Sequence, residues 1–286
     1  MGSLNPPDVK PYTEVSYKTA QPDYAVIPAL PARCIVAGPS GQGKGVLIQN
    51  LLLKYWRNKF AKIFYFSPTV NLDPALIPVK EYAEKVLGQD DWSHDRYDSD
   101  MLQEIIDTQT KVCDYIKKKK PHGGHMHSIC IVLDDLADDA KIFHGAQGKP
   151  IVSLFLRGRH IKITTVCSTQ IWKALHPHIR RNALSLFVFK LRSQAEVQAF
   201  AEELSALHPH GRQGILDLYR EATDEPHSYL YVDLTAKRPA DMFFRKWKKL
   251  ALINESSTDS EGLDDAEQDR AGGRGHPRQA PAIRDR

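Results

Sequence analysis

Residues Gly38 to Gly45 read GPSGQGKG and combine closely spaced glycines with one lysine. Glycines let successive backbone N–H groups turn inward to form a nest for phosphate oxygens, and the start of a following helix adds partial positive charge. Lys44 would bring a full charge to the terminal phosphates. The alternative is an ordinary glycine turn between a strand and a helix. The residues expected to contact a nucleotide are Gly38, Pro39, Ser40, Gly41, Gln42, Gly43, Lys44 and Gly45.

The last position of this motif departs from G-x-x-x-x-G-K-[ST], because Gly45 stands where a serine or threonine is usual. That hydroxyl ordinarily ligates Mg²⁺, and glycine has no group that can do so. Either the metal is held by water and a second, acidic motif, or turnover is weakened. Glycine inside a helix also costs roughly 1 kcal/mol relative to alanine, so Gly45 is not there for helix stability.

The acidic motif is Ser128 to Asp135, SICIVLDD, an apolar run that ends in two carboxylates. A buried strand that ends in acidic residues has the form of a Walker B element. Asp134 would hold the magnesium ion, and Asp135 would polarise the attacking water. The alternative is a strand followed by an acidic helix cap.

A further polar side chain, Gln170, ends the β-branched run Lys162 to Gln170, KITTVCSTQ. In open parallel sheets, ligands collect at the carboxyl ends of the strands. Gln170 would then lie beside the γ-phosphate, where it could sense phosphate or orient water. A surface glutamine is the alternative.

The elements that must position these residues follow from apolar runs and helical periodicity. Continuous apolar runs at 34–37, 61–67 and 184–191 predict strands buried on both faces, as in a parallel sheet. Helices are expected at 44–56, 74–88, 100–118, 151–160, 194–204 and 211–222. The lysines at 117–120 would end one helix, either as solvated cations or as a phosphate-binding patch. The fold class predicted is α/β, with a central, mostly parallel sheet flanked by helices.

The two ends of the chain differ from its middle in composition. Residues 1–30 are rich in proline and predict an extended lead-in, whereas 254–286 are highly charged and predict a disordered tail. The ATPase-like domain would span 31–250. Within it, 227–234 alternates like a later strand, either at an edge of the sheet or inside it. Residues 242–250, MFFRKWKKL, suit an amphipathic surface element, a surface helix or a nucleic-acid contact.

Composition limits the class of protein. The chain has 286 residues, of which 42% are hydrophobic, so a sizeable core is possible. No apolar run approaches 18 residues and the N-terminus lacks an apolar segment, so neither a membrane span nor secretion is expected. Four scattered cysteines indicate reduced thiols in an intracellular protein. A net charge of +4 does not by itself indicate nucleic-acid binding.

Taken together, GPSGQGKG, IVLDD, LRGRHIKITTVCSTQ and HPHIRRNALSLFVFKL resemble the DNA-packaging ATPases of large double-stranded DNA viruses. These form the poxvirus-type branch of the FtsK–HerA superfamily of P-loop NTPases. The resemblance covers residues 30 to 250. Its most specific part is the basic GRH turn followed by a strand that ends in glutamine.

The resemblance implies a RecA-like core that binds ATP and Mg²⁺ and assembles into a homo-oligomeric ring that pumps double-stranded DNA. Lys44 would be the phosphate lysine, Asp134 and Asp135 the acidic pair, and Gln170 the polar sensor. Arg157 or Arg159 would reach the γ-phosphate of the neighbouring subunit, with Arg180 and Arg181 as the second choice. Capsid proteins are further possible partners, and the virion or host cytoplasm is the implied location.

Two other classes of function fit parts of the sequence. A nucleotide-binding assembly protein without turnover is favoured by Gly45. A small-molecule kinase would also use the phosphate loop, but it needs an arginine-rich lid, and no compact lid is visible. Since Gly45 departs from the family pattern, it puts catalysis in doubt more than nucleotide binding.

Overall fold

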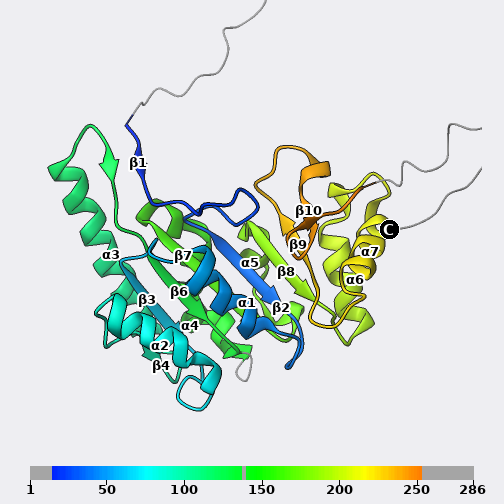
Figure 1. Ribbon diagram of the computed structural model, residues 1–286, viewed down its shortest axis with the longest axis horizontal. Coiled ribbons are helices and arrows are strands. Elements are labelled where there is room, and N and C mark those ends of the chain that lie inside the picture. Colours follow the sequence, from blue (N-terminus) through cyan, green and yellow to red (C-terminus); the bar gives the residue numbers. More distant parts are fainter. Residues whose placement is uncertain (1–14, 137–139, 253–286) are drawn as a thin grey trace, which may run out of the picture. The chain divides into compact units, whose positions relative to one another are not determined.

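Six strands form the parallel part of a nine-stranded sheet in the computed structural model, which describes residues 15–136 and 140–252 (Figure 1). The order across the sheet is β11-β10-β9-β8-β2-β7-β6-β3-β4. The strands from β8 to β4 run parallel, and β9, β10 and β11 are each antiparallel to their neighbours. The parallel strands are β2 (Arg33–Ala37), β3 (Lys62–Phe66), β4 (Ser93–His94), β6 (Ile129–Leu133), β7 (Ile163–Thr169) and β8 (Ser185–Phe189).

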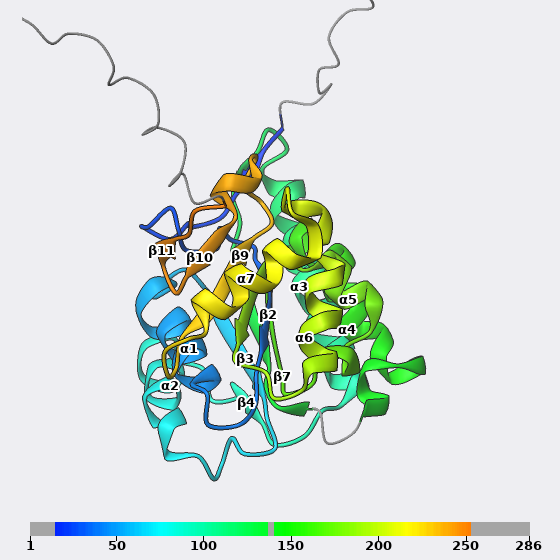
Figure 2. The same ribbon diagram turned by 90° about the vertical axis from the view of Figure 1, so that its right-hand side faces the viewer.

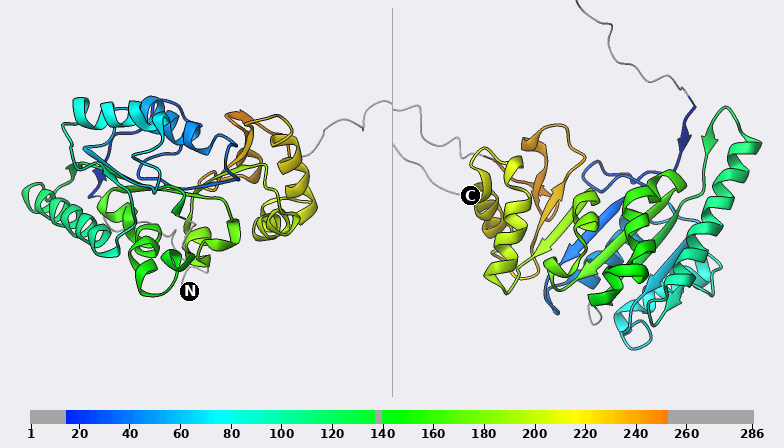
Figure 3. Two further views of the ribbon diagram at one scale, coloured as in Figure 1. Left: turned by 90° about the horizontal axis from the view of Figure 1, so that it is seen from below. Right: turned by 180° about the vertical axis from the view of Figure 1, so that it is seen from behind.

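Helices cover both faces of this sheet. The view from below in Figure 3 shows α1 and α2 on one face and α3, α4 and α5 on the other. Their bounds are α1 (Lys44–Asn50), continued by the π-helical turn η1 (Leu51–Tyr55), α2 (Ile77–Glu81), α3 (Ser99–Lys119), α4 (Gly145–Arg157), α5 (Pro177–Asn182), α6 (Gln194–Glu203) and α7 (Gly211–Ala222). The predicted α/β architecture with a mostly parallel sheet is therefore confirmed.

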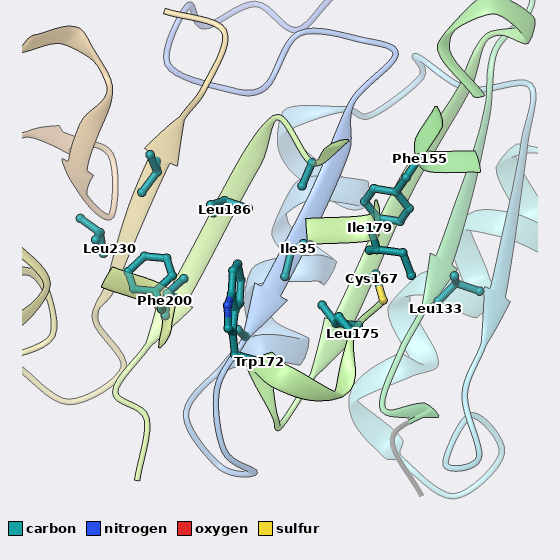
Figure 4. Packing of buried hydrophobic residues seen from close by; sticks show 14 of the residues in the cluster. Ile35, Leu133, Phe155, Cys167, Trp172, Leu175, Ile179, Leu186, Phe200 and Leu230 are labelled. Atoms are coloured by element: carbon teal, nitrogen blue, oxygen red, sulfur yellow. The ribbon is translucent and has the colours of Figure 1, made fainter. Parts of the chain in front are cut away.

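The central strands are apolar throughout because both of their faces are buried. In β2, Ile35 and Ala37 point into the core under α3 to α7, whereas Cys34 and Val36 point into the core under α1 and α2. Figure 4 shows the first of these cores, where Ile35 lies near Leu186 and Cys167 from the two neighbouring strands. Side chains alternate between the two faces of a strand, and because helices cover both faces of the sheet, each face has its own core.

The predicted helix at 100–118 corresponds to α3, whose start and end have clear physical causes. The carboxylate of Asp98 accepts hydrogen bonds from the backbone N–H groups of Asp100 and Met101, at 2.9 and 3.0 Å, and so caps the helix. Lysines at 117–119 form the last turn, where cations complement the helix dipole.

Two of the alternatives for the C-terminal part are wrong. The strand β9 (Tyr229–Asp233) is not at an edge, because it pairs with both β8 and β10. Residues 242–250 form no helix but a hairpin of β10 (Phe243–Arg245) and β11 (Lys248–Lys249), which extends the sheet beyond β9 (Figure 2). Apolar Phe243 is fully buried on β10 while the basic side chains of β11 are exposed, so strand pairing accounts for the mixed composition.

The lead-in contributes contacts in its described part, residues 15–30. Tyr17–Lys18 form the short strand β1, which pairs with β5 (Gly124–His125). Ile27 and Leu30 are buried in the core under α1. Residues 1–14 and the predicted disordered tail at 254–286 lie outside the described residues. No helix in the described ranges combines the length and apolar character needed to cross a membrane.

Candidate nucleotide-binding site

The glycine-rich loop connects β2 to α1, as predicted, and its glycines have conformational reasons to be there. Gly41 and Gly43 have φ angles of +80° and +101°, which favour glycine. A Cβ atom on Gly38 would lie 2.7 Å from the Cβ atom of Phe189 on β8, a distance that side chains do not tolerate. The loop backbone therefore packs closely against β8, and other residues of the loop line a cavity.

Lys44 opens α1, and its side chain is 8% exposed. Its ammonium group donates a hydrogen bond to the carbonyl oxygen of Pro39 at 3.3 Å, so it folds back over the loop. Burial lowers the pKa of Lys44, and the nearby carboxylates of Asp135 and Asp134 oppose that effect. Lys44 and the two aspartates therefore share one electrostatic environment.

Asp134 follows β6 and is held by the neighbouring strand β3. Its backbone N–H donates to the carbonyl oxygen of Phe66 at 2.8 Å, and its carboxylate accepts a hydrogen bond from the Tyr65 hydroxyl at 2.7 Å. Burial raises the pKa of Asp134, and the hydrogen bond from Tyr65 partly offsets this. A buried carboxylate whose ionised form is disfavoured gains most from a cation placed next to it.

Asp135 adopts the left-handed backbone conformation, with φ of +52°. Aspartate adopts this region several-fold more readily than most residues. The side-chain amide of Gln170 donates to both carboxylate oxygens of Asp135, each at 2.8 Å. Since a carboxylate only accepts hydrogen bonds, this contact fixes the orientation of the amide.

The strand order explains why these groups meet. β7 lies between β2 and β6, so Gln170 at the end of β7 stands between the glycine-rich loop and the two aspartates. Lys44, Asp134 and Asp135 line one cavity of about 1040 Å³ at the carboxyl ends of the strands. Gln170 is not a lining residue of that cavity, but it is hydrogen-bonded to Asp135, which is one. The structure thus brings together the predicted lysine, the acidic pair and the glutamine, at the carboxyl ends of the strands, where open α/β sheets bind ligands.

Gly45 also lines this cavity, and a Cβ atom placed on it would meet nothing within 4 Å. Space for a hydroxyl-bearing side chain therefore exists at the position where the motif usually has one. The backbone does not explain the glycine either, since the positive φ angles of the loop are at Gly41 and Gly43.

The candidate arginines lie elsewhere. Arg157 ends α4 and donates to the Ser153 hydroxyl at 3.1 Å, and Arg159 lies in the turn η6 (Gly158–Ile161) directly before β7. Both are exposed and precede the amino end of β7, so they are away from the cavity at the carboxyl ends. Arg180 forms an ion pair with Glu203 at 2.8 Å, and Arg181 is exposed. Among the described residues lining the cavity there is no arginine.

A magnesium ion fits the donors of this site when phosphate is present. Within the described ranges, no three His, Cys, Asp or Glu side chains form a group that could hold a metal alone. Mg²⁺ is commonly held by one or two carboxylates, water and substrate phosphates. Asp134, with its partly buried carboxylate in the same cavity as the glycine-rich loop, offers that kind of incomplete shell.

Sequence reasoning missed Tyr65 and the far wall of the cavity, which is formed by His227, Tyr229, Lys246 and Trp247. Tyr65 lies within an apolar run that indicates only a strand. Its role depends on β3 lying beside β6, which no local pattern reveals. The wall residues lie about 180 residues after the loop, and no motif links the two regions.

Comparison with known proteins gives three results. The model of the family described as Poxvirus A32 protein matches residues 20–213. The Uncharacterized protein 075L of Invertebrate iridescent virus 6 is 25% identical over 218 residues, which is 72% of each chain. The genome packaging NTPase B204 of Sulfolobus turreted icosahedral virus 2, solved with AMP, aligns with a TM-score of 0.51 at 14% identity, over 78% of this chain and 99% of that one.

A further structure, EssC (ATPases 2 and 3) from Geobacillus thermodenitrificans, aligns with a TM-score of 0.51 at 13% identity, over 90% of this chain and 49% of that one. At such low identity, these two structures establish the fold. It is the fold of P-loop ATPases, as the sequence predicted.

Proposed function

Because the chain belongs to the poxvirus A32 protein family, as its motifs predicted, we propose that it is a genome-packaging ATPase that couples hydrolysis of Mg-ATP to movement of double-stranded DNA. The P-loop ATPase fold supports an ATPase in general. In this proposal residues 31–250 are the ATPase domain, 1–30 are a lead-in and 254–286 are a charged tail.

One observation carries the proposal: a buried lysine that follows β2 and two aspartates that follow β6 line the same cavity. The backbone N–H groups of the loop and Lys44 would bind the triphosphate, which needs concentrated positive charge. Asp134 would enter the coordination shell of Mg²⁺, and Tyr65 would hold its carboxylate in orientation. The metal, when bound, would neutralise charge that develops on the phosphates.

Asp135 would orient and polarise the attacking water in this proposal. Its carboxylate is held on one side by Gln170, which leaves its remaining acceptor capacity for a water molecule in the cavity. Gln170 therefore acts through Asp135. A shift of phosphate or water at Asp135 would be transmitted to the end of β7 by this hydrogen-bonded pair.

No arginine lines the cavity in the part of the chain that the structure describes, and we propose that a neighbouring subunit in a homo-oligomeric ring supplies one through Arg157 or Arg159. Such an arginine stabilises the charge of the transition state and contributes about 10³-fold or more in other NTPases. Double-stranded DNA would be the substrate that the ring moves, in the virion or host cytoplasm. Capsid proteins are candidate partners at that step.

The test is the rate of ATP hydrolysis with Mg²⁺, with and without double-stranded DNA, on protein whose assembly is monitored by light scattering. We expect hydrolysis to require Mg²⁺ and to rise when double-stranded DNA is added. Single-stranded DNA of the same length is the matched control. Folded and assembled protein that hydrolyses ATP at the same rate with and without duplex would contradict the translocase proposal.

Gly45 favours a second candidate, a nucleotide-binding assembly protein that does not turn over. Gly45→Ser separates the two, since the open space at this position accepts a hydroxymethyl group. A motor limited by the missing ligand would hydrolyse ATP several-fold faster with serine. Tight ATP binding without turnover in both proteins, at high protein concentration, would select the assembly protein.

A further inference from the structure

The cavity extends well beyond the groups that would bind a triphosphate. Its acidic residues follow β6, and β6 and β7 both lie on the same side of β2. The γ-phosphate end of a nucleotide would therefore point toward β7 and β6. The nucleoside must extend from the glycine-rich loop in the other direction across the sheet, toward β8, β9 and β10.

The wall on that side is aromatic. His227 lies directly behind the loop, since a Cβ atom on Gly43 would be 3.7 Å from its Nδ1 atom. Farther along, Tyr55 from η1 and Trp247 from the turn between β10 and β11 line the cavity, and their ring centroids are 5.3 Å apart. The hairpin is thus placed beside α1 and η1 (Figure 2).

Trp247 differs from the other tryptophans of the chain. Trp56, Trp92 and Trp172 are at most 4% exposed and belong to the two cores. Trp247 is only partly buried, and the structure gives it edge-type ring contacts with Tyr55, Phe187, Tyr229 and Tyr231, at interplanar angles of 70° to 81°. Trp247 is therefore a partly exposed aromatic residue in the wall of the cavity.

We propose that Trp247 and Tyr55 form the nucleobase subsite of this cavity, with the base of a nucleoside triphosphate stacked on the indole of Trp247. This inference rests on the proposed nucleotide site and adds the C-terminal hairpin to it. A flat, partly exposed aromatic surface suits any nucleobase, because every base has a π-face. The hairpin would then close the end of the cavity opposite the acidic pair.

The experiment compares binding of ATP and of tripolyphosphate, each with Mg²⁺, to wild type, Trp247→Ala and Trp247→Phe by calorimetry. We expect Trp247→Ala to weaken ATP binding about tenfold or more, the size of one base–aromatic stack, and to leave tripolyphosphate binding unchanged. Trp247→Phe keeps an aromatic ring and should retain most of the affinity. Tyr24→Ala is the control, because the Tyr24 ring packs against Tyr55 with a centroid distance of 6.3 Å but does not line the cavity.

Tryptophan fluorescence of the wild type gives a second readout that needs no substitution. Saturating ATP should change it, tripolyphosphate should not, and the change should be absent in Trp247→Phe. Wild type that binds ATP without this change, or Trp247→Ala that binds ATP as tightly as wild type, overturns the subsite and leaves the proposed function standing. Wild type that binds neither ligand overturns the proposed function, and the subsite with it.

Discussion

The cavity at the carboxyl ends of the strands and the basic turn before β7 carry charge in different ways. At the carboxyl ends, Lys44 is buried and Asp134 is partly buried, and each has a polar partner within the chain. At the amino ends, Arg159 is exposed, and none of the ion pairs in the described ranges includes it. Buried and paired groups are preorganised for a ligand that enters the cavity, whereas exposed cations are free to meet another molecule. In the proposed function, one chain would hold most of the phosphate site, and Arg157 or Arg159 of a neighbouring chain would supply the cation.

The strongest way to break this comparison is to remove the exposed cations. Arg157→Ala with Arg159→Ala should lower ATPase activity of the assembled protein about 10³-fold and leave ATP affinity unchanged, because neither residue lines the cavity of its own chain. Steady-state hydrolysis and calorimetry measure the two quantities.

Arg212→Ala is the matched control, since Arg212 is an exposed arginine on α7. The single variants identify which arginine acts. Mixing the double variant with Asp135→Asn subunits should restore activity, because the first supplies an intact Asp135 and the second supplies intact arginines. Full activity of the double variant would show that the two ends of the sheet work independently.

Removing the acid at the opposite end should have an effect of about 10²-fold or more. Asp135→Asn keeps the left-handed backbone and the contact with Gln170, but it removes the carboxylate that would polarise water. Hydrolysis should fall while ATP affinity stays near that of wild type. An active Asp135→Asn protein would mean that another group has this role.

Tyr65→Phe tests whether the groups at the carboxyl ends of the strands are preorganised for a metal ion. Losing the 2.7 Å hydrogen bond to Asp134 should raise the Mg²⁺ concentration needed for half-maximal hydrolysis about tenfold, since groups that orient a metal ligand have effects of that size. Saturating Mg²⁺ should restore the rate. Tyr97→Phe removes a hydroxyl that bonds to the Gln147 carbonyl instead, and it should leave the Mg²⁺ requirement unchanged.

The smallest expected effect is on stability. The pKa of Asp134 is raised by burial, so without ligand the folded chain loses stability as the pH rises from the ordinary aspartate pKa to the raised value, and the loss is complete above it. Asp134→Asn should therefore raise Tm at neutral pH by about 2–4 °C, which corresponds to about 1 kcal/mol in a chain of this size. The gain should vanish as the pH falls toward the ordinary aspartate pKa of 3.8, where wild type is protonated as well. A thermal-shift series over pH measures this, and a constant gain at every pH would contradict the cause given.

The sequence predicts the part of the site that is encoded locally. The apolar runs ending in Asp134 and Gln170 and the glycine loop before Lys44 each carry their own signal, and parallel pairing then places all three at one edge of the sheet. Tyr65 could not be found in this way because its role depends on lateral strand order.

The C-terminal hairpin illustrates the other limit. Its strands contain three and two residues, which is too short for a two-residue period to be distinguished from an amphipathic helix. Pairing with β9 settles the conformation of that segment, and with it the position of Trp247. The first failure concerns a contact between elements, and the second concerns an element whose conformation is decided by such a contact.

The left-handed turn at Asp135 also limits how this position can evolve. Asparagine and glycine, each one nucleotide away from an aspartate codon, suit a φ of +52° but carry no charge. Glutamate, also one nucleotide away, keeps the charge but adopts this backbone conformation less readily than aspartate. Its side chain is also one methylene longer, which would displace the carboxylate from its position beside the amide of Gln170. Neutral drift therefore has little room here, because every short mutational step gives up either the geometry or the acid.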